Sequence, residues 1–212
     1  MDATRTDGWY PETLAPGAVV IRGIAGDASA SLVQCIGNVA RDAPFRRVVT
    51  PGGKPMSVEM TNCGDRGWVS DHRGYRYEEL DPASNRPWPP IPGEFLELAD
   101  RASVIAGFGP FSPDVCLINR YAVGSSMGMH QDRDERDFGS PIVSVSLGLP
   151  IRFRIGGTTR GGRTNGTVLE HGDVVVFGGP ARLAFHGVGT LRAGHHPLTG
   201  DVRYNLTFRV SR

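Results

Sequence analysis

The amino-acid sequence predicts a mainly β fold with flanking helices, in which the C-terminal half forms a sandwich, barrel or jelly roll. After residue 114 the chain becomes a series of short β-type runs that glycine, proline and aspartate separate at close intervals. These runs are VCLINRY, PIVSVSLG, IRFRIGG, DVVVFGG, RLAFHGV and RYNLTFRV. No long helical pattern intervenes between them, as is typical of closed or double-layered β folds. A length of 212 residues, with 39% hydrophobic and 21% charged residues, fits one globular domain.

Two amphipathic helices are predicted in the first half. The first spans residues 27–43, where apolar residues recur at helical spacing and Pro44 ends the pattern. The second begins after Pro92, and Gly107 offers a C-terminal cap. The apolar positions that define the two helices are Leu32, Cys35, Ile36 and Val39 in the first, and Phe95, Leu98, Ala102 and Ile105 in the second.

Residues 44–92 have a different composition, rich in proline, glycine and arginine. The aromatic residues Trp68, Tyr75, Tyr77 and Trp88 are scattered through this segment. The pattern predicts long loops and hairpins rather than a core, and loops of that length in a compact domain are usually functional. The sequence therefore predicts a helical and loop-rich N-terminal half beside a C-terminal β-core.

The overall charge excludes a uniformly basic nucleic-acid-binding protein. The formal net charge is +1, so any contact with a polyanion must come from a local basic patch. Candidates for such a patch are Arg46, Arg47, Arg66, Arg73 and Arg76.

Cysteine spacing and hydropathy predict a soluble protein of a reducing compartment. Cys35, Cys63 and Cys116 lie far apart without paired spacing, which argues against a disulfide framework or a zinc site. The N-terminal stretch MDATRTDGWYPETLAPG lacks the basic and apolar regions of a secretory signal, and no run of eighteen apolar residues occurs. We expect a cytoplasmic location.

A candidate metal site begins with His130 and Asp132. On an extended strand these two side chains project from the same face and can reach one ion. His186, in the run RLAFHGV, is the candidate third ligand. Two histidines and one carboxylate on one face of Fe(II) would leave the opposite positions open for a chelating acid and for dioxygen. A buried structural histidine is the alternative interpretation of His186.

A second triplet, His171-Gly172-Asp173, fits the same H-x-D pattern. Its central glycine, and its place between Glu170 and the apolar run VVVF, are typical of a turn that enters a strand. The first triplet is therefore favoured as the metal site.

The run from Arg203 to Arg209 predicts a binding strand. With a period of two, Arg203, Asn205, Thr207 and Arg209 face one side, and the residues between them face the other. Two fixed guanidiniums suit a small dicarboxylate such as 2-oxoglutarate, because each carboxylate can accept a bidentate pair of hydrogen bonds. An exposed amphipathic strand would look similar.

A pair in the run LINRY supports the same hypothesis. Asn119 and Tyr121 would project together and could donate to the same ligand. Ordinary polar strand residues are the alternative.

Several runs together resemble the bacterial AlkB alkylation-repair dioxygenases. They are APFRRVVTPGG, MSVEMTNCG, CLINRYAVG, HQDRDE, PIVSVSLGLP, LEHGDVVVFGG and HPLTGDVRYNLTFR. The resemblance extends from about residue 14 to residue 209 and includes the spacing between motifs. The sequence departs from the family's pattern mainly at residues 158–167, TTRGGRTNGT.

The resemblance implies one Fe(II)/2-oxoglutarate dioxygenase domain over residues 1–212, with a double-stranded β-helix, or jelly-roll, core. Residues 14–112 would form an N-terminal extension that carries a nucleotide-recognition lid, and residues 113–212 the catalytic core. The implied metal ligands are His130, Asp132 and His186. The implied contacts to 2-oxoglutarate are Asn119, Tyr121, Arg203, Asn205 and Arg209, with Arg203 on the distal carboxylate and Arg209 nearer the metal.

The resemblance also assigns substrate contacts. A base inside a duplex must be flipped out, at a cost of a few kcal/mol, before a buried metal can reach it. Trp68 matches the family's base-stacking residue, so the base would lie between its indole and the His130 ring. Independently of the resemblance, Asp134 would share the strand direction of Asp132 if the strand continued, which would place a carboxylate at the pocket edge and favour cationic N-methylated bases over normal ones. A solvated acidic run, DRDE, is the alternative interpretation. Further implied contacts are Tyr75, Tyr77, Thr50, Met60 and Arg160.

The implied function is oxidative demethylation of 1-methyladenine and 3-methylcytosine in single- or double-stranded DNA or in RNA, by a monomer that does not bind membranes. Fe(II), 2-oxoglutarate and O2 are required, and formaldehyde, succinate and CO2 are released. Two alternatives remain at this stage. One is an oxygenase that acts mainly on RNA or another substrate, and the other is a non-catalytic jelly-roll binding module.

Overall fold

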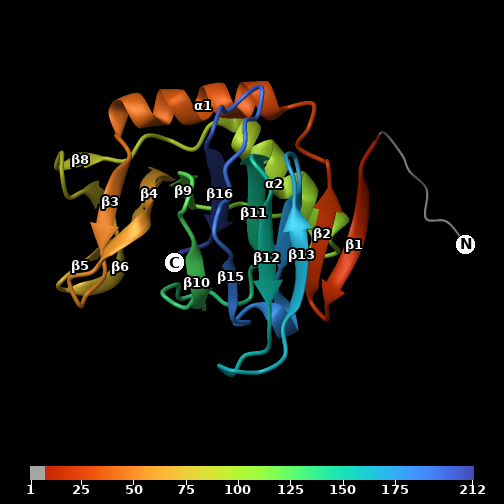
Figure 1. The fold of residues 1–212 in the computed structure, drawn as a ribbon. Coiled ribbons are helices and arrows are strands. Elements are labelled where there is room, and N and C mark those ends of the chain that lie inside the picture. The colour runs from red at the N-terminus through yellow and green to blue at the C-terminus, as the bar shows by residue number, and fades with distance from the viewer. Residues whose placement is uncertain (1–7) are drawn as a thin grey trace, which may run out of the picture.

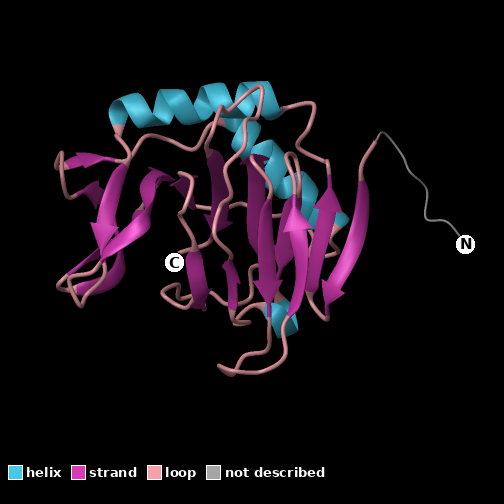
Figure 2. Cartoon of the chain, viewed as in Figure 1, coloured by secondary structure: helices cyan, strands magenta, loops and turns pink. Residues whose placement is uncertain are grey.

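A computed structural model describes residues 8–212, and two β-sheets that face each other dominate it (Figure 1). Residues 1–7, part of the N-terminal stretch in which no secretory signal is expected, lie outside the described residues. Both long helices lie on the same side of the strands, which form the larger part of the cartoon (Figure 2). The prediction of a mainly β fold with flanking helices is confirmed.

The large sheet contains eight strands in the order β1-β2-β14-β11-β16-β9-β4-β3. All of its neighbouring strands are antiparallel. In sheet order the bounds are β1 Tyr10–Ala15, β2 Ala18–Arg22, β14 Val174–Phe177, β11 Ile142–Gly148, β16 Arg203–Arg209, β9 Val115–Tyr121, β4 Pro55–Gly64 and β3 Arg46–Val49.

The small sheet contains four antiparallel strands in the order β10-β15-β12-β13. Their bounds are β10 Met127–His130, β15 His186–Val188, β12 Ile151–Ile155 and β13 Asn165–Leu169. A short 3₁₀-helix, Gly179–Ala181, follows β14 and leads toward β15.

Two hairpin-like pairs form a separate lid beside the sheets. They are β5 Gly67–Asp71 with β6 Gly74–Glu78, and β7 Leu80–Asp81 with β8 Arg86–Pro87. Trp88 anchors them: its indole donates to the Glu78 carbonyl at 3.0 Å and lies directly over Gly67, where any side chain would collide with the ring.

The two helices, α1 Ser29–Asp42 and α2 Gly93–Ile105, confirm the sequence predictions. All the apolar positions predicted for α1 are buried, as are Phe95, Leu98 and Ala102 of α2. These faces pack against one side of the large sheet and form a first hydrophobic core. A second hydrophobic core lies between the two sheets, and some of its residues line the cavity described below.

Alternation along β16 assigns its two faces as the sequence predicts. Leu206 and Phe208 belong to the core under the helices. Arg203, Asn205 and Arg209 project the other way, into the space between the sheets, where they line a cavity. The strand thus separates an apolar interior from a polar one.

The structure corrects two expectations about the first half of the chain. Residues 44–92 are not mainly loops outside the core, because β3 and β4 extend the large sheet and Val58, Met60 and Cys63 of β4 are buried. β1 and β2 also join this sheet, so strands from both sides of residue 112 form one continuous layer. Proline and glycine at the ends of β4 mask a strand whose later residues, 60–63, are buried on both faces.

Two further differences concern the second half. The run RLAFHGV forms a strand only at its end, because a turn with hydrogen bonds from Ala184 to Ala181 and from Arg182 to Gly179 precedes it. The glycine-rich stretch 158–167 contributes the beginning of β13, which pairs with β12.

Candidate active site

A cavity of about 700 Å³ lies between the two sheets and opens beside the lid. Its volume falls within the range of about 300–1,000 Å³ typical of ligand sites. β9, β11 and β16 of the large sheet supply one wall, and β10, β12 and β15 of the small sheet supply the other. Trp68 and Tyr75 of the lid border the opening.

His130, Asp132 and His186 meet inside this cavity. One potential ligand atom from each residue lies within 4.8 Å of the other two. The two histidines face each other across β10 and β15, with ring centroids 4.5 Å apart. A register shift between Met127 and His130 brings them opposite each other, because three residues of β10 span what two residues of β15 span.

Both imidazoles are oriented by their own backbone. His130 Nδ1 lies 2.9 Å from the Gly128 carbonyl, and His186 Nδ1 lies 3.0 Å from the Ala184 carbonyl. A carbonyl accepts only, so Nδ1 carries the proton in each ring and Nε2 is left as a free lone pair. The Nε2 atoms lie 3.6 Å and 3.8 Å from the Asp132 carboxylate, in the direction expected for ligands of one ion.

Asp132 lies two residues past the end of β10 rather than within it. The strand ends at His130, so the predicted extended-strand placement holds only for the histidine. Arg209 fixes the carboxylate instead, by donating from Nη2 at 2.8 Å and from Nε at 3.0 Å to Oδ2. The triplet is therefore held by the small sheet at one end and by the large sheet at the other.

Electrostatics keep this donor set in the form that binds a cation. Burial alone would raise the pKa of Asp132, but Arg209 and the two imidazoles outweigh it and hold this pKa below its usual range. Burial lowers the pKa of His186 to about 4. A charged carboxylate beside the neutral imidazole of His186 is the state that a metal requires. Two imidazole nitrogens and one carboxylate, with the cavity on the open side, fit Fe(II) as used by oxygenases.

Arg203 carries an unpaired charge at the other end of the cavity. Its side chain is 1% exposed, and its Nη2 donates to Ser146 Oγ at 2.8 Å. Nε and Nη1 have no hydrogen-bond partner among the described residues. Burial without a carboxylate lowers the pKa of this guanidinium. An unsatisfied buried cation is costly, so the site calls for an anionic ligand.

The remaining predicted contacts to 2-oxoglutarate line the same wall. Asn119 donates to Asn205 at 3.2 Å, while the Asn119 Oδ1 atom has no hydrogen-bond partner within residues 8–212. Tyr121 lies under the Arg203 guanidinium, 5.2 Å from it, and its buried hydroxyl has a raised pKa because of burial. Arg209 also keeps one free buried donor, Nη1. These orphaned polar atoms between Arg203 and the metal triplet fit a five-carbon keto diacid.

Trp68 and Asp134 lie together at the mouth of the cavity. The indole Nε1 of Trp68 donates to Asp134 Oδ2 at 2.9 Å, and Tyr75 stacks on the Trp68 ring with centroids 5.4 Å apart. Because the strand does not continue past His130, Asp134 reaches this position from a loop. A carboxylate thus lies beside an aromatic platform at the opening.

The other predicted substrate residues lie in different places. Met60 and Arg160 line the cavity, and Arg160 lies over the Phe185 ring at 4.8 Å. Tyr77 is turned inward and donates to Glu135 at 2.5 Å. Thr50 lies in the turn between β3 and β4, where it accepts from Lys54, and it is not among the residues that line the cavity.

Sequence reasoning missed a buried acid beside the site. Glu135, only 6% exposed, receives Tyr77 from the lid and Arg182 at 3.2 Å from the 3₁₀ turn. Arg182 also donates to the Asp132 carbonyl at 2.8 Å. Glu135 lies in the charged run DRDE, whose density of charge is the one local signal that could have indicated it. Ser144 and Ser146 lie at alternate positions of β11, and this alternation is a clearer sequence signal for polar side chains that belong to the site.

The second triplet lies in a turn, as the sequence predicts. Gly172 has φ +87°, and Asp173 accepts the backbone N–H groups of Gly23 and Glu170. His171 stacks on His196 with centroids 4.2 Å apart. None of these residues lines the cavity.

Most of the arginines proposed for a basic patch around the lid are neutralised by ion pairs. Arg46 pairs with Asp81, Arg66 with Glu79, and Arg76 with Asp71 and Glu78. Arg73 also pairs with Asp71. Arg47 is the exception among the five candidate arginines, since it forms no ion pair with any of residues 8–212.

A metal triplet between two antiparallel sheets, beside a buried anion site, defines the class of 2-oxoglutarate-dependent oxygenases. A family model described as "2OG-Fe(II) oxygenase superfamily" matches residues 17–209, and the chain belongs to this family. It is 54% identical, over 94% of its length and 93% of the relative's, to the alpha-ketoglutarate-dependent dioxygenase AlkB of Escherichia coli.

Two further relatives extend the comparison. The chain is 34% identical to a DNA N(6)-methyladenine demethylase, ALKBH1C of Arabidopsis thaliana, over 69% of this chain and 38% of that protein. The solved structure of OsALKBH1 superposes with a TM-score of 0.84 at 28% identity, covering 95% of this chain and 100% of that one. The resemblance to AlkB dioxygenases and the jelly-roll fold are thereby confirmed, and the chain is a dioxygenase that uses Fe(II), 2-oxoglutarate and O2.

Proposed function

We propose that this dioxygenase removes methyl groups from alkylated bases of nucleic acids, with 1-methyladenine and 3-methylcytosine in DNA as substrates. One oxygen atom of O2 enters succinate as 2-oxoglutarate loses CO2, and the other hydroxylates the N-methyl carbon. The resulting hemiaminal breaks down to formaldehyde and the normal base. The balance is one 2-oxoglutarate and one O2 for each methyl group.

The observation that carries the proposal is the alignment of three features along one cavity. A buried unpaired guanidinium lies at one end, the metal triplet in the middle, and an aromatic platform with a carboxylate at the mouth. A diacid and a flipped base could occupy the two ends at once, with the metal between them. The cavity volume of about 700 Å³ leaves room for both.

Each residue has a role that follows from its contacts. Arg203 would bind the distal carboxylate of 2-oxoglutarate with its two free donors, and Asn119 and Tyr121 would border the chain of the diacid. Bound iron supplies the oxidising chemistry, held by His130, Asp132 and His186. Arg209 would keep Asp132 in place and turn its free Nη1 toward the diacid.

The lid side would select the base. Trp68 offers an indole on which a flipped base can stack, opposite the His130 ring. Bases methylated at N1 of adenine or N3 of cytosine are cationic near neutral pH, so the Asp134 carboxylate would favour them over normal bases. Met60 would pack against the base, while Tyr75, Tyr77, Thr50 and Arg160 would form or support the path of the strand.

The decisive experiment uses an oligonucleotide that carries one 1-methyladenine or 3-methylcytosine. Incubation with the protein, Fe(II), ascorbate and 2-oxoglutarate should lower its mass by one methylene group and release succinate and formaldehyde in equal amounts. A folded, metal-loaded protein that forms neither product would refute the proposal. Matched RNA and DNA oligonucleotides, single- and double-stranded, would separate a mainly RNA-directed enzyme from a DNA-directed one.

We also propose that the protein acts in the cytoplasm as a monomer. Its three cysteines are free and buried, as expected in a reducing compartment. Among the described residues no helix is long and apolar enough to cross a membrane.

A further inference from the structure

Positive charge is concentrated on the outer face of the small sheet. The segment from β12 to β13, residues 151–169, contains four arginines and no aspartate or glutamate. β10 and β15 contain no carboxylate either. All 22 acidic residues of the chain therefore lie outside these four strands and the connection between β12 and β13. This face has a positive local field although the net charge of the chain is only +1.

Arg152 and Arg154 occupy the centre of this face. Residues of β12 alternate, so Ile151, Phe153 and Ile155 are buried toward the cavity while the two arginines are exposed. Neither guanidinium has a hydrogen bond or an ion pair with any of residues 8–212. This contrasts with the lid, whose arginines are mostly paired with carboxylates.

Glycines lie opposite Arg154 on both neighbouring strands, whereas Arg152 lies opposite the exposed Val168 on β13. Arg154 lies opposite Gly166 on one side and Gly187 on the other, and the Arg152 carbonyl accepts from Gly189. The Arg154 Cγ and the Arg152 Nη2 lie 3.4 Å and 3.9 Å from the position of a β-carbon built on Gly166. The two side chains thus converge over one glycine, which has no side chain of its own to block the approach of a phosphate.

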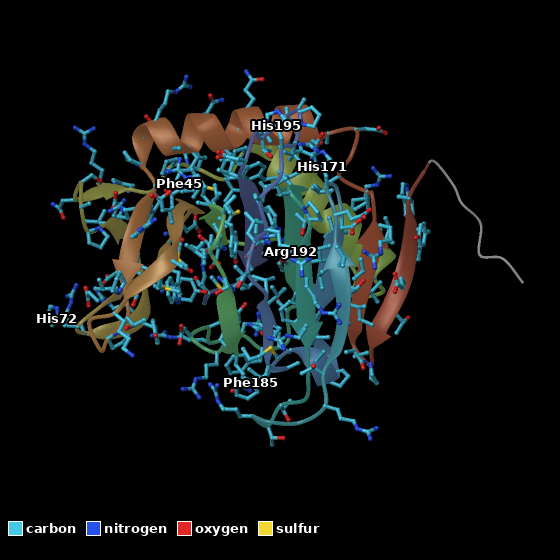
Figure 3. All side chains as sticks on the ribbon, viewed as in Figure 1. Phe45, His72, His171, Phe185, Arg192 and His195 are labelled. Atoms are coloured by element: carbon cyan, nitrogen blue, oxygen red, sulfur yellow. The ribbon has the colours of Figure 1, made fainter. Side chains whose placement is uncertain are left out.

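The face is continuous with the mouth of the cavity. β12 and β13 are joined by residues 156–164, which carry Arg160 and Arg163. Arg160 lines the cavity, and Gln131, next to the metal ligands, donates to the Thr158 carbonyl at 3.2 Å. In the view of Figure 3, Phe185 marks the lower end of the small sheet near this connection, and Arg192 lies over its middle.

We propose that this arginine face binds the phosphate backbone of the nucleic acid beyond the flipped nucleotide, as a second contact surface outside the catalytic cavity. The inference rests on the proposed function for the identity of the substrate. A strand that leaves the mouth past Arg160 and Arg163 reaches Arg154 and then Arg152. Contacts to phosphate carry no sequence information, so they would add affinity for long substrates whatever their sequence.

The test compares oligonucleotide binding by the wild type with binding by a double variant, Arg152→Gln and Arg154→Gln. The metal-loaded protein with 2-oxoglutarate, kept without oxygen, is titrated with an unmodified trinucleotide and an unmodified strand of about 20 nucleotides. Loss of two phosphate contacts should weaken binding of the long strand about tenfold at 0.1 M salt. It should also reduce the dependence of log K on log salt by about 1.4, and leave the trinucleotide unaffected.

A matched control removes the same charge from the helical layer. The variant Arg41→Gln with Arg101→Gln changes two exposed arginines of α1 and α2, which contact Asn38 and the Trp9 ring rather than a carboxylate, so it reproduces the shift in net charge far from the proposed face. An equal loss of affinity in this control would overturn the proposal. Unchanged long-strand binding in the Arg152/Arg154 variant would also overturn it. If this variant instead lost only its binding to anionic phosphatidylserine vesicles, the face would be assigned to membranes.

Failure of the proposed function gives a different result. In that case the wild type does not demethylate a methylated trinucleotide, and the double variant behaves the same. Demethylation of the trinucleotide by both proteins, together with a raised KM for the long methylated strand only in the variant, supports both proposals.

Discussion

Replacement of Arg203 by methionine separates ligand binding from folding. The wild-type guanidinium is fully buried with two free donors, Nε and Nη1. Each hydrogen bond from a charged donor contributes about 1.5–3 kcal/mol. Together they are worth about 3–6 kcal/mol, so the variant should lose at least about 100-fold in affinity for 2-oxoglutarate.

The same substitution should not destabilise the protein without ligand. Methionine has a similar length, and replacing a buried charge that lacks a partner by an apolar group is often neutral or stabilising. The thermal midpoint without 2-oxoglutarate should therefore stay the same or rise. Addition of 2-oxoglutarate should raise the thermal midpoint of the wild type but not that of the variant, because the ligand stabilises only the folded state that binds it.

The assay measures succinate formation against 2-oxoglutarate concentration, together with thermal unfolding of the metal-loaded protein in the absence of oxygen. Arg41→Met, on the exposed surface of α1, is the matched control and should change neither quantity. A change of less than about threefold in the apparent affinity of the Arg203 variant would refute the role of the unpaired guanidinium.

Three other predictions concern the lid, the cavity mouth and a distant histidine pair. Trp68→Ala should retain succinate formation without substrate but raise the KM for methylated oligonucleotide about 10- to 100-fold, since stacking contributes about 1–3 kcal/mol per base; an unchanged KM would exclude stacking. Asp134→Asn should lower the preference for cationic 1-methyladenine over a neutral etheno adduct up to about fivefold, measured as the ratio of kcat/KM values. Burial and the neighbouring His196 hold the pKa of His171 below its ordinary value, so the folded state binds fewer protons than the unfolded chain below about pH 6.5. The free energy of unfolding should therefore fall as pH falls through this region, and His171→Gln should reduce that loss in urea titrations at about pH 7.5 and about pH 5.5; equal losses in both proteins would contradict the assignment.

The sequence predicted those parts of the site that depend on strand alternation. Arg203, Asn205 and Arg209 share a face because side chains of a strand alternate, and no distant residue changes that. The predicted helices also form, since their apolar faces meet the large sheet. His130 and His186 meet as expected because their strands pair directly.

Features that depend on distant partners were not predictable in this way. Asp132 lies past the end of its strand and is held by Arg209, which is 77 residues away. Glu135 is buried only because the lid and a 3₁₀ turn close over it. The charge of Arg46 is cancelled by Asp81, which is 35 residues away. Local patterns carry no information on such tertiary pairs.

Because of the register shift in β10, activity should depend on the number of residues in this strand. One extra residue between Met127 and His130 decides which face of the sheet the histidine occupies, because each residue added or removed reverses the direction of the next side chain. Point substitutions at Gly128 or Met129 leave that count intact, whereas a single-codon deletion there would turn the imidazole toward solvent. Deletion scanning of this strand should thus abolish activity in variants that still fold, and grafts between homologues must conserve the number of residues in this stretch rather than their identity.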